Sequence, residues 1–212
     1  MADRYDTLDN PEGRFQPGSN DRVLINKLGI IEPTEMDEIE LNLMGQLTEV
    51  VLGEVEADQV ISSNDLCEWH RRWLGNVYVW AGQYRSVNMG KGDFQFAAAH
   101  LIDGLMQKLD KNFLAIYTPC YRMSEGELAE ALAIIHIETI LIHPFRDGNG
   151  RLSRLVSNIM ALQADYPMLD FSYMDNKREA YFSAIQAGLD DNEPLQKIFR
   201  QVLLDSLKNA GD

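Results

Sequence analysis

Apolar residues recur along most of this chain with the three-to-four spacing that places them on one face of an α-helix. The first such helix is expected to begin at Thr34, and its apolar positions are Met36, Ile39, Leu43, Leu47 and Val50 or Val51. A second is expected after the N-cap residues Ser62 and Ser63, with an apolar side formed by Leu66, Trp69, His70, Trp73 and Leu74. The spacing therefore predicts a helical core that starts near residue 34.

Residues 77–96 interrupt this helical pattern. Three glycines divide the segment, and the alternation Phe94-Gln95-Phe96 is typical of a short strand. We expect this strand to pair with residues 86–88 in a hairpin whose turn comprises residues 89–92.

Helical spacing returns from about His100. Residues 124–127, Ser-Glu-Gly-Glu, match a capping box and open an apolar run that ends at Ile142. Because this run is so rich in apolar residues, it is predicted to form the central buried helix of the domain. Further helices are expected from Arg151, over residues 176–187 and over residues 194–207. The predicted fold class is all-α, a helical bundle with one small β-hairpin.

The first 33 residues differ from the rest of the chain. They are polar and contain three prolines, which is typical of an irregular arm. With 212 residues, the chain is long enough for one domain with a sizeable core. The predicted organisation is an arm over residues 1–33 and a domain over residues 34–212.

The charge of the chain limits its partners. Against 19 basic residues there are 33 acidic ones, which gives a formal net charge of −14. Such a surface repels nucleic acid and anionic membranes, so neither is an expected partner. From the apolar runs we expect neither a secretory signal nor a transmembrane segment, and Cys67 and Cys120 suit a reducing compartment. We expect a cytoplasmic protein, and export by a route that needs no such signal stays open.

Residues 143–154, HPFRDGNGRLSR, carry the most informative chemistry. Gly148 and Gly150 precede a predicted helix, where exposed amides can bind phosphate oxygens. Arg151 and Arg154 share a face of its first turn, where the helix dipole disfavours cations that no anion offsets. The alternatives are an ordinary Gly-Asn-Gly turn and arginines paired with surface carboxylates.

Two further residues of this segment are candidates for catalysis. Asp147 is a hard oxygen ligand suited to Mg²⁺ that also contacts phosphates, or else a cap of the following turn. His143 is a candidate general base, because the unperturbed pKa of histidine suits proton abstraction near neutral pH; the alternative is a histidine that interacts with a helix C-terminus. Phe145 is expected to anchor the loop in the core. Jointly, at this spacing, these residues favour phosphoryl or nucleotidyl transfer.

The segment matches the signature H-x-F-x-[DE]-G-N-G-R-x-x-R of Fic domains at every specified position, so the chain resembles that family. Residues 80–85, WAGQYR, look like the family's W-A-G-x-x-R segment, and residues 91–96 resemble its flap. The resemblance covers roughly residues 34–205. It implies a helical core with a hairpin flap over the active site. It also implies transfer of AMP from ATP to a Tyr, Thr or Ser hydroxyl of a target protein, with release of pyrophosphate.

The resemblance also assigns roles to residues. His143 would deprotonate the target hydroxyl, and Asp147 would hold Mg²⁺ on the α- and β-phosphates. The anion hole would be lined by Asn149 with the amides of Gly148 and Gly150. The leaving pyrophosphate would be held by Arg151 and Arg154. By looser analogy, Asn176 and Tyr181 would reach the adenine pocket.

The predicted flap comprises Lys91, Gly92, Asp93, Phe94, Gln95 and Phe96. An exposed strand edge there could pair with an extended segment of the target through main-chain hydrogen bonds. One of Phe94 and Phe96 is expected to cover the core, on the reasoning that alternating strand residues point to opposite faces.

Many family members carry an inhibitory helix with the motif [ST]-x-x-x-E-[GN]. Residues 34–39 fail this motif at its last position, and residues 206–211 have Ala in place of the Glu. An antitoxin-like partner, or no such brake, is therefore expected. Other readings stay open: another nucleotide or phosphocholine as donor, an interaction module that binds nucleotide without catalysis, or AMP removal. A kinase-like relative is less favoured, since its signature has Lys where this chain has Gly150.

Overall fold

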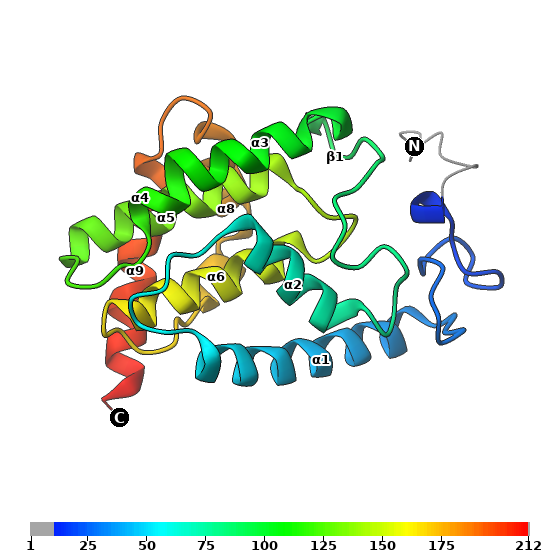
Figure 1. The fold of residues 1–212 in the computed structure, drawn as a ribbon, viewed down its shortest axis with the longest axis horizontal. Coiled ribbons are helices and arrows are strands. Elements are labelled where there is room, and N and C mark those ends of the chain that lie inside the picture. The colour runs from blue at the N-terminus through cyan, green and yellow to red at the C-terminus, as the bar shows by residue number, and fades with distance from the viewer. Residues whose placement is uncertain (1–10, 212) are drawn as a thin grey trace. The chain divides into compact units, whose positions relative to one another are not determined.

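The computed structural model describes residues 11–211, and these are mostly helical (Figure 1). The α-helices are α1 (Pro33–Glu54), α2 (Ser63–Leu74), α3 (Ile102–Leu109), α4 (Ala115–Tyr117), α5 (Glu125–Ile142), α6 (Asn149–Gln163), α7 (Ser172–Asn176), α8 (Arg178–Ala187) and α9 (Glu193–Ala210). Short helical turns η1 (Pro11–Gly13), η2 (Ala99–Leu101) and η3 (Asp110–Leu114) supplement them. Among the described residues the only sheet has two strands, so the predicted fold class is confirmed.

The chain divides into two compact units. The first comprises the described residues up to Glu54, together with Ser63–Met106 and Ile142–Leu152. The second comprises Val55–Ser62, Gln107–Leu141 and the described residues from Ser153 onward. The predicted division into an arm over residues 1–33 and a domain over residues 34–212 stays a prediction.

In the first unit, α1 and α2 begin within a residue of their predicted starts and pack against each other. The buried positions of α1 are Met36, Glu40, Leu47 and Val51. Ile39 and Leu43, which the apolar pattern also assigned to this face, are half-buried. A carboxylate therefore lies on the stripe of α1 that faces the core.

The described part of the predicted arm, residues 11–32, is irregular, as expected from its composition. Beyond η1, its regular structure is an isolated antiparallel bridge between Phe15 and Leu24. Lys27 donates its main-chain N–H to the carbonyl oxygen of Val77, at 2.8 Å. Residues 1–10 of the predicted arm lie outside the described residues.

The hairpin exists, but its predicted register is wrong. Strand β1 (Gly90–Lys91) pairs with β2 (Phe94–Gln95), with Gly90 opposite Gln95 and Lys91 opposite Phe94. The turn is therefore Gly92-Asp93 and the partner strand is not residues 86–88. Gly92 has a φ of 59°, a left-handed conformation that favours glycine at the first position of a two-residue turn.

In the second unit, α5 begins with the predicted capping box. Ser124 donates its main-chain N–H to Glu127 Oε2 at 2.8 Å, and Glu127 returns an N–H to Ser124 Oγ at 3.4 Å. Helices α7, α8 and α9 pack on one another. The predicted helices over residues 176–187 and 194–207 correspond to α8 and α9.

A buried polar cluster ties α5 to α8 within the second unit. His136 contacts the Tyr181 hydroxyl through Nε2 at 2.7 Å and the Ser153 hydroxyl through Nδ1 at 2.9 Å. Burial lowers the pKa of His136 to about 3, so the imidazole is neutral at neutral pH. The Tyr181 hydroxyl is therefore engaged in the interior, whereas the sequence had suggested that this residue reaches an adenine pocket.

We expect Tyr181→Phe to lower the free energy of unfolding by about 1–2 kcal/mol, because it leaves a buried imidazole nitrogen without its hydrogen bond. Urea denaturation followed by circular dichroism measures this. Tyr121→Phe is the matched control, since that side chain is 54% exposed and its loss should be near zero. Equal effects of the two substitutions would contradict the role of the buried bond.

Candidate active site

The loop between α5 and α6 is closed by the side chain of Asn149. Its Oδ1 accepts the main-chain N–H of Phe145 at 2.8 Å, and its Nδ2 donates to the Phe145 carbonyl at 2.7 Å. Asn149 is buried, with 2% of its surface exposed. The side-chain amide thus shapes the loop, and the main-chain N–H of Asn149 lies at the start of α6, where it can face an anion.

His70 of α2 connects this loop to the segment Trp80–Arg85. Burial lowers its pKa to about 4, so the ring is neutral at neutral pH. Its Nδ1 accepts the N–H of Gly82 at 2.8 Å, and its Nε2 lies 3.1 Å from the carbonyl oxygen of Asp147. Because a carbonyl can only accept, Nε2 carries the proton. The ring also stacks on Phe145, with centroids 4.1 Å apart.

The two glycines of the signature have different roles. Gly148 has a φ of 82°, and a Cβ there would collide with the ring of Trp73. Gly150 is exposed, and a Cβ there would meet no atom within 4 Å. The first glycine is therefore required by packing, and the second leaves the beginning of α6 open.

His143 follows the last residue of α5 and has a φ of 51°. Phe96, at the end of the hairpin, stacks on the imidazole with centroids 3.8 Å apart and an interplanar angle of 9°. Phe94 contacts Phe96 edge to face at 5.5 Å. The expectation that these two phenylalanines point to opposite faces is wrong, because residues two apart in a strand share a face.

Arg85, the last residue of the predicted W-A-G-x-x-R segment, holds the hairpin and His143 together. Its buried guanidinium donates to the carbonyls of Val87 at 2.6 Å and Ala97 at 2.5 Å, on either side of the hairpin. It also donates to the carbonyls of Ile142 at 3.2 Å and His143 at 2.7 Å. These last two are helix-end carbonyls that α5 itself cannot satisfy.

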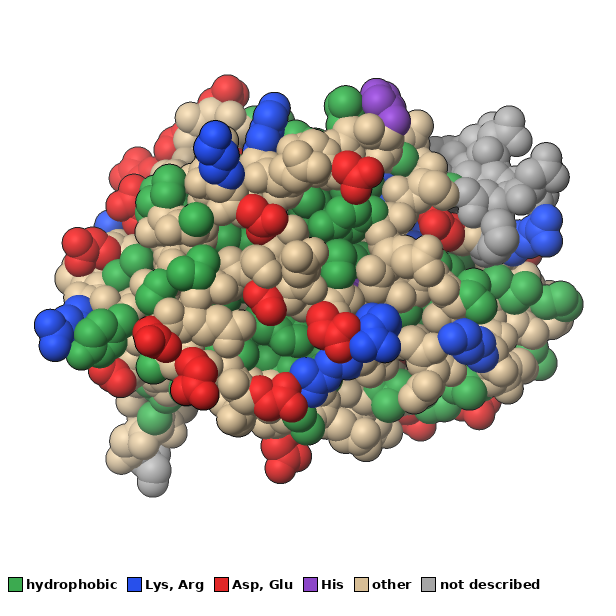
Figure 2. Space-filling view, in the orientation of Figure 1, with side chains coloured by type: hydrophobic (Ala, Val, Ile, Leu, Met, Phe, Trp, Pro, Cys, Tyr) green, Lys and Arg blue, Asp and Glu red, His purple; other side chains and the backbone are tan. Residues whose placement is uncertain are grey.

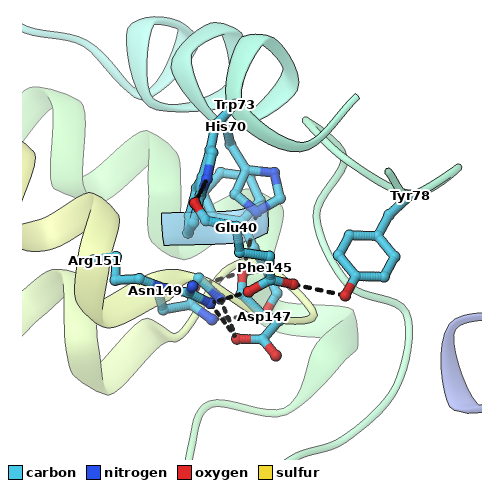
Figure 3. Close-up of polar contacts among 9 residues, drawn as sticks. Glu40, His70, Trp73, Tyr78, Phe145, Asp147, Asn149 and Arg151 are labelled. Carbon is cyan, nitrogen blue, oxygen red and sulfur yellow. Dashed lines mark hydrogen bonds and ion pairs between the residues drawn. The ribbon is translucent and has the colours of Figure 1, made fainter. Parts of the chain in front are cut away.

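Arg151 and Asp147 meet a third charged residue that the sequence did not single out (Figure 3). Arg151 Nη2 lies 2.7 Å from Glu40 Oε2 and 3.5 Å from Asp147 Oδ1. Glu40 is buried, while the carboxylate of Asp147 is exposed. An acidic residue on the apolar stripe of α1 was the available signal, and a pattern built from apolar residues alone passes over it.

In the second unit, Arg154 forms a two-point contact with Asp175, at 2.6 Å and 3.2 Å. Its guanidinium lies over the ring of Phe171, 5.0 Å from the centroid. Asp175 is 61% exposed, so this pair is open to exchange with solvent anions. Asn176 is exposed at the end of α7.

Within residues 11–211 no group of three or more His, Cys, Asp or Glu side chains is placed to hold a metal ion. Asp147 offers one exposed carboxylate, with Oδ1 accepting the N–H of Gly148 at 2.5 Å. Mg²⁺ in nucleotide sites commonly takes one or two carboxylates and completes its shell with phosphates and water. The donor set therefore fits a magnesium–nucleotide complex better than a resident metal.

Acidic side chains are spread over the face shown in Figure 2 and do not gather in one patch. None of the described helices is long and apolar enough to span a membrane.

The chain is similar to known proteins in sequence and in fold. The Fic/DOC family model matches residues 60–161. A protein adenylyltransferase fic-1 of Caenorhabditis briggsae is 32% identical over 140 residues, covering 63% of this chain and 25% of that protein. A probable protein adenylyltransferase Fic of Escherichia coli K12 is 30% identical over 139 residues, covering 63% of this chain and 66% of that protein.

Among solved structures, the N-terminal Fic domain of an effector protein from Bartonella sp. AR 15-3 superposes with a TM-score of 0.78. It is 21% identical and the match covers 95% of this chain and 94% of that chain, which supports the fold. Residues 60–161 of this chain therefore form a Fic/DOC family domain. The chain spans about a quarter of the length of the nematode relative and just under two thirds of the bacterial one.

The neutral state of His70 makes a prediction about pH. Its folded-state pKa of about 4 lies below the ordinary 6.5, so the unfolded chain binds the proton more tightly. The stability that His70 contributes is present above pH 6.5 and is lost as the pH falls through 4. Between these limits the loss attributable to this residue is about 3 kcal/mol.

We therefore expect the gap in unfolding free energy between wild type and His70→Asn to narrow as the pH falls from 6.5 to 4. Urea titrations at several pH values measure the gap, and other groups titrate equally in both proteins. A gap that stays constant would mean that the buried imidazole carries a proton throughout.

Proposed function

We propose that this protein transfers AMP from ATP to a Tyr, Thr or Ser hydroxyl of a target protein and releases pyrophosphate. The observation that carries the proposal is the rigid loop between α5 and α6. In it a histidine, an exposed carboxylate and an open helix start follow one another within eight residues, from His143 to Gly150. The names of the curated relatives support the same chemistry.

In this reaction His143 accepts the proton of the target hydroxyl while its oxygen attacks the α-phosphorus of ATP. The bond from the α-phosphorus to the bridging oxygen breaks, and the electron pair leaves with pyrophosphate. The Phe96 ring, stacked on the imidazole, holds its plane. A positioned base of this kind contributes about 10²–10⁴-fold to a rate.

The phosphates would be bound at the start of α6. The main-chain N–H groups of Asn149 and Gly150 would supply donors where the helix dipole favours negative charge. The N–H of Gly148 would join them by exchanging its bond to Asp147 Oδ1 for a phosphate oxygen. Arg151 and Arg154 supply the fixed positive charges, and Arg154 would exchange its exposed partner Asp175 for a phosphate. Asp147 is the residue that would hold Mg²⁺, which neutralises phosphate charge when bound.

The flap, residues Lys91–Phe96, would bind the target. Among the described residues β2 has one neighbouring strand, β1, so its other edge can accept an extended segment through main-chain hydrogen bonds. Main-chain pairing demands little of the target sequence. The two aromatic rings beside His143 would then contact the side chain that carries the hydroxyl.

The partners proposed are a target protein and, for regulation, an antitoxin-like protein in trans. The acidic surface argues against nucleic acid and anionic membranes as partners. A cytoplasmic location accords with the cysteine usage, because Cys67 and Cys120 form no CxxC pair and have no metal-ligand spacing.

We expect His143→Ala to abolish transfer of label from α-labelled ATP to protein in a cell extract with Mg²⁺. Its affinity for ATP should be unchanged, because the imidazole acts on the target hydroxyl. His100→Ala, which alters an exposed histidine outside the site, is the control and should keep full activity. Label retained in His143→Ala would refute the base, and label from γ-labelled ATP alone would indicate kinase chemistry. The same transfer assay with other labelled nucleotides and with a labelled phosphocholine donor identifies the group that the protein transfers.

A second prediction concerns Arg154. We expect Arg154→Ala to weaken binding of ATP about tenfold, corresponding to about 1.4 kcal/mol, because it removes a charge-assisted phosphate contact. Titration calorimetry with Mg²⁺ present measures this. Arg178→Ala is the control, since Arg178 is an exposed arginine at the start of α8. An affinity equal to that of the wild type would remove Arg154 from the phosphate site.

A further inference from the structure

Glu40 lies outside the signature, yet its carboxylate contacts the first signature arginine. We infer that Glu40 is a positioning residue for the phosphate site: it fixes one edge of the Arg151 guanidinium and leaves the remaining edge for the nucleotide. This role rests on the proposed nucleotide transfer.

Both carboxylate oxygens of Glu40 have a fixed partner (Figure 3). Oε2 lies 2.7 Å from Arg151 Nη2, and Oε1 accepts the Tyr78 hydroxyl at 2.6 Å. The carboxylate is 5% exposed. Two donors on opposite oxygens set the orientation of the carboxylate, which therefore presents one defined oxygen to the arginine.

The groups that hold Glu40 belong to rigid parts of the first unit. The indole N–H of Trp73 donates to the Glu40 carbonyl at 2.9 Å, which ties α2 to α1 at this residue. Tyr78 stacks on Trp80, with centroids 4.4 Å apart. The carboxylate is thus built on packed elements rather than on a mobile loop.

The planar guanidinium of Arg151 packs with one face on an aromatic ring, in addition to its ion pairs along one edge. Its guanidinium carbon lies 4.5 Å from the centroid of the Trp73 ring. Both ion pairs, with Glu40 and with Asp147, use the same nitrogen, Nη2. The side chain stays 36% exposed, and a guanidinium carries five donors. Nη1 and Nε take part in neither ion pair, so they are the donors that a phosphate would meet.

A carboxylate beside a phosphate-binding arginine could instead compete with the phosphate. A competing carboxylate has to leave its arginine when the phosphate binds, as the exposed Asp175 can leave Arg154. Burial raises the pKa of Glu40, and the Arg151 charge and the Tyr78 hydrogen bond oppose that rise. A carboxylate that loses its cation inside the protein is strongly disfavoured. Glu40 is therefore built to stay with Arg151 while the nucleotide binds.

Calorimetric measurement of the affinity for a non-hydrolysable ATP analogue with Mg²⁺ tests this role. The proteins are wild type, Glu40→Gln, Arg151→Ala and the double variant. The neutral amide keeps the volume of Glu40 but lacks the charge that orients the guanidinium. We expect Glu40→Gln to weaken binding about tenfold, and to have no further effect once Arg151 is replaced. Tighter binding by Glu40→Gln would show competition and overturn the inference. Equal weakening in the Arg151→Ala background would also overturn it, since Glu40 would then act through the general fold.

Glu38→Gln is the matched control. It removes the same charge from the exposed face of α1, two residues away, and should leave the affinity unchanged. Thermal unfolding of each variant verifies that it is folded.

A measurement without nucleotide separates this inference from the proposed function. In the wild type, NMR should show resolved Arg151 Nη protons from restricted rotation of the guanidinium, and these should be lost in Glu40→Gln. A wild type with no affinity for the ATP analogue refutes nucleotide transfer together with the phosphate half of this role. Freely rotating guanidinium protons in the wild type refute the anchoring itself.

Discussion

The geometry of the site depends on one neutral imidazole. His70 accepts a hydrogen bond from Gly82 and lies in hydrogen-bonding distance of the Asp147 carbonyl, while its face stacks on Phe145. The first bond requires Nδ1 without a proton, and the second requires a proton on Nε2. These two contacts select the tautomer, while burial keeps the ring neutral. In a protonated ring, Nδ1 would carry a hydrogen that faces the N–H of Gly82, and this hydrogen bond would be lost. The conformation of the signature loop thus depends on a residue that takes no part in the proposed chemistry.

The placement of charge follows a second constraint. To bind the proposed triphosphate, an acidic chain would have to keep its arginines from being neutralised by its own carboxylates. The two signature arginines meet carboxylates of different kinds. Glu40 is buried and bound at both oxygens, so it can orient Arg151 permanently. Asp175 is exposed, so its pairing with Arg154 is weak and can be exchanged.

Much of the fold could be predicted from the sequence, because apolar periodicity and caps are local signals. The starts of α1 and α2 and the capping box at Ser124 are examples. The hairpin register could not be predicted in the same way, since it depends on which glycine adopts a positive φ. The signature predicted the candidate site residues, but their tertiary partners depend on packing. Glu40 is the clearest case, because an acidic residue within a helix is ordinarily read as solvent-exposed.

Arg85 connects the flap to the proposed base, His143. Arg85 donates to carbonyls on both sides of the hairpin and to the carbonyls of Ile142 and His143. One buried guanidinium therefore sets the distance between the strand that would bind the target and the imidazole that would deprotonate it. A lysine has no planar fork with which to reach four carbonyls. In the proposed reaction, where the target is held through its main chain, the register of the bound segment would determine which hydroxyl reaches His143.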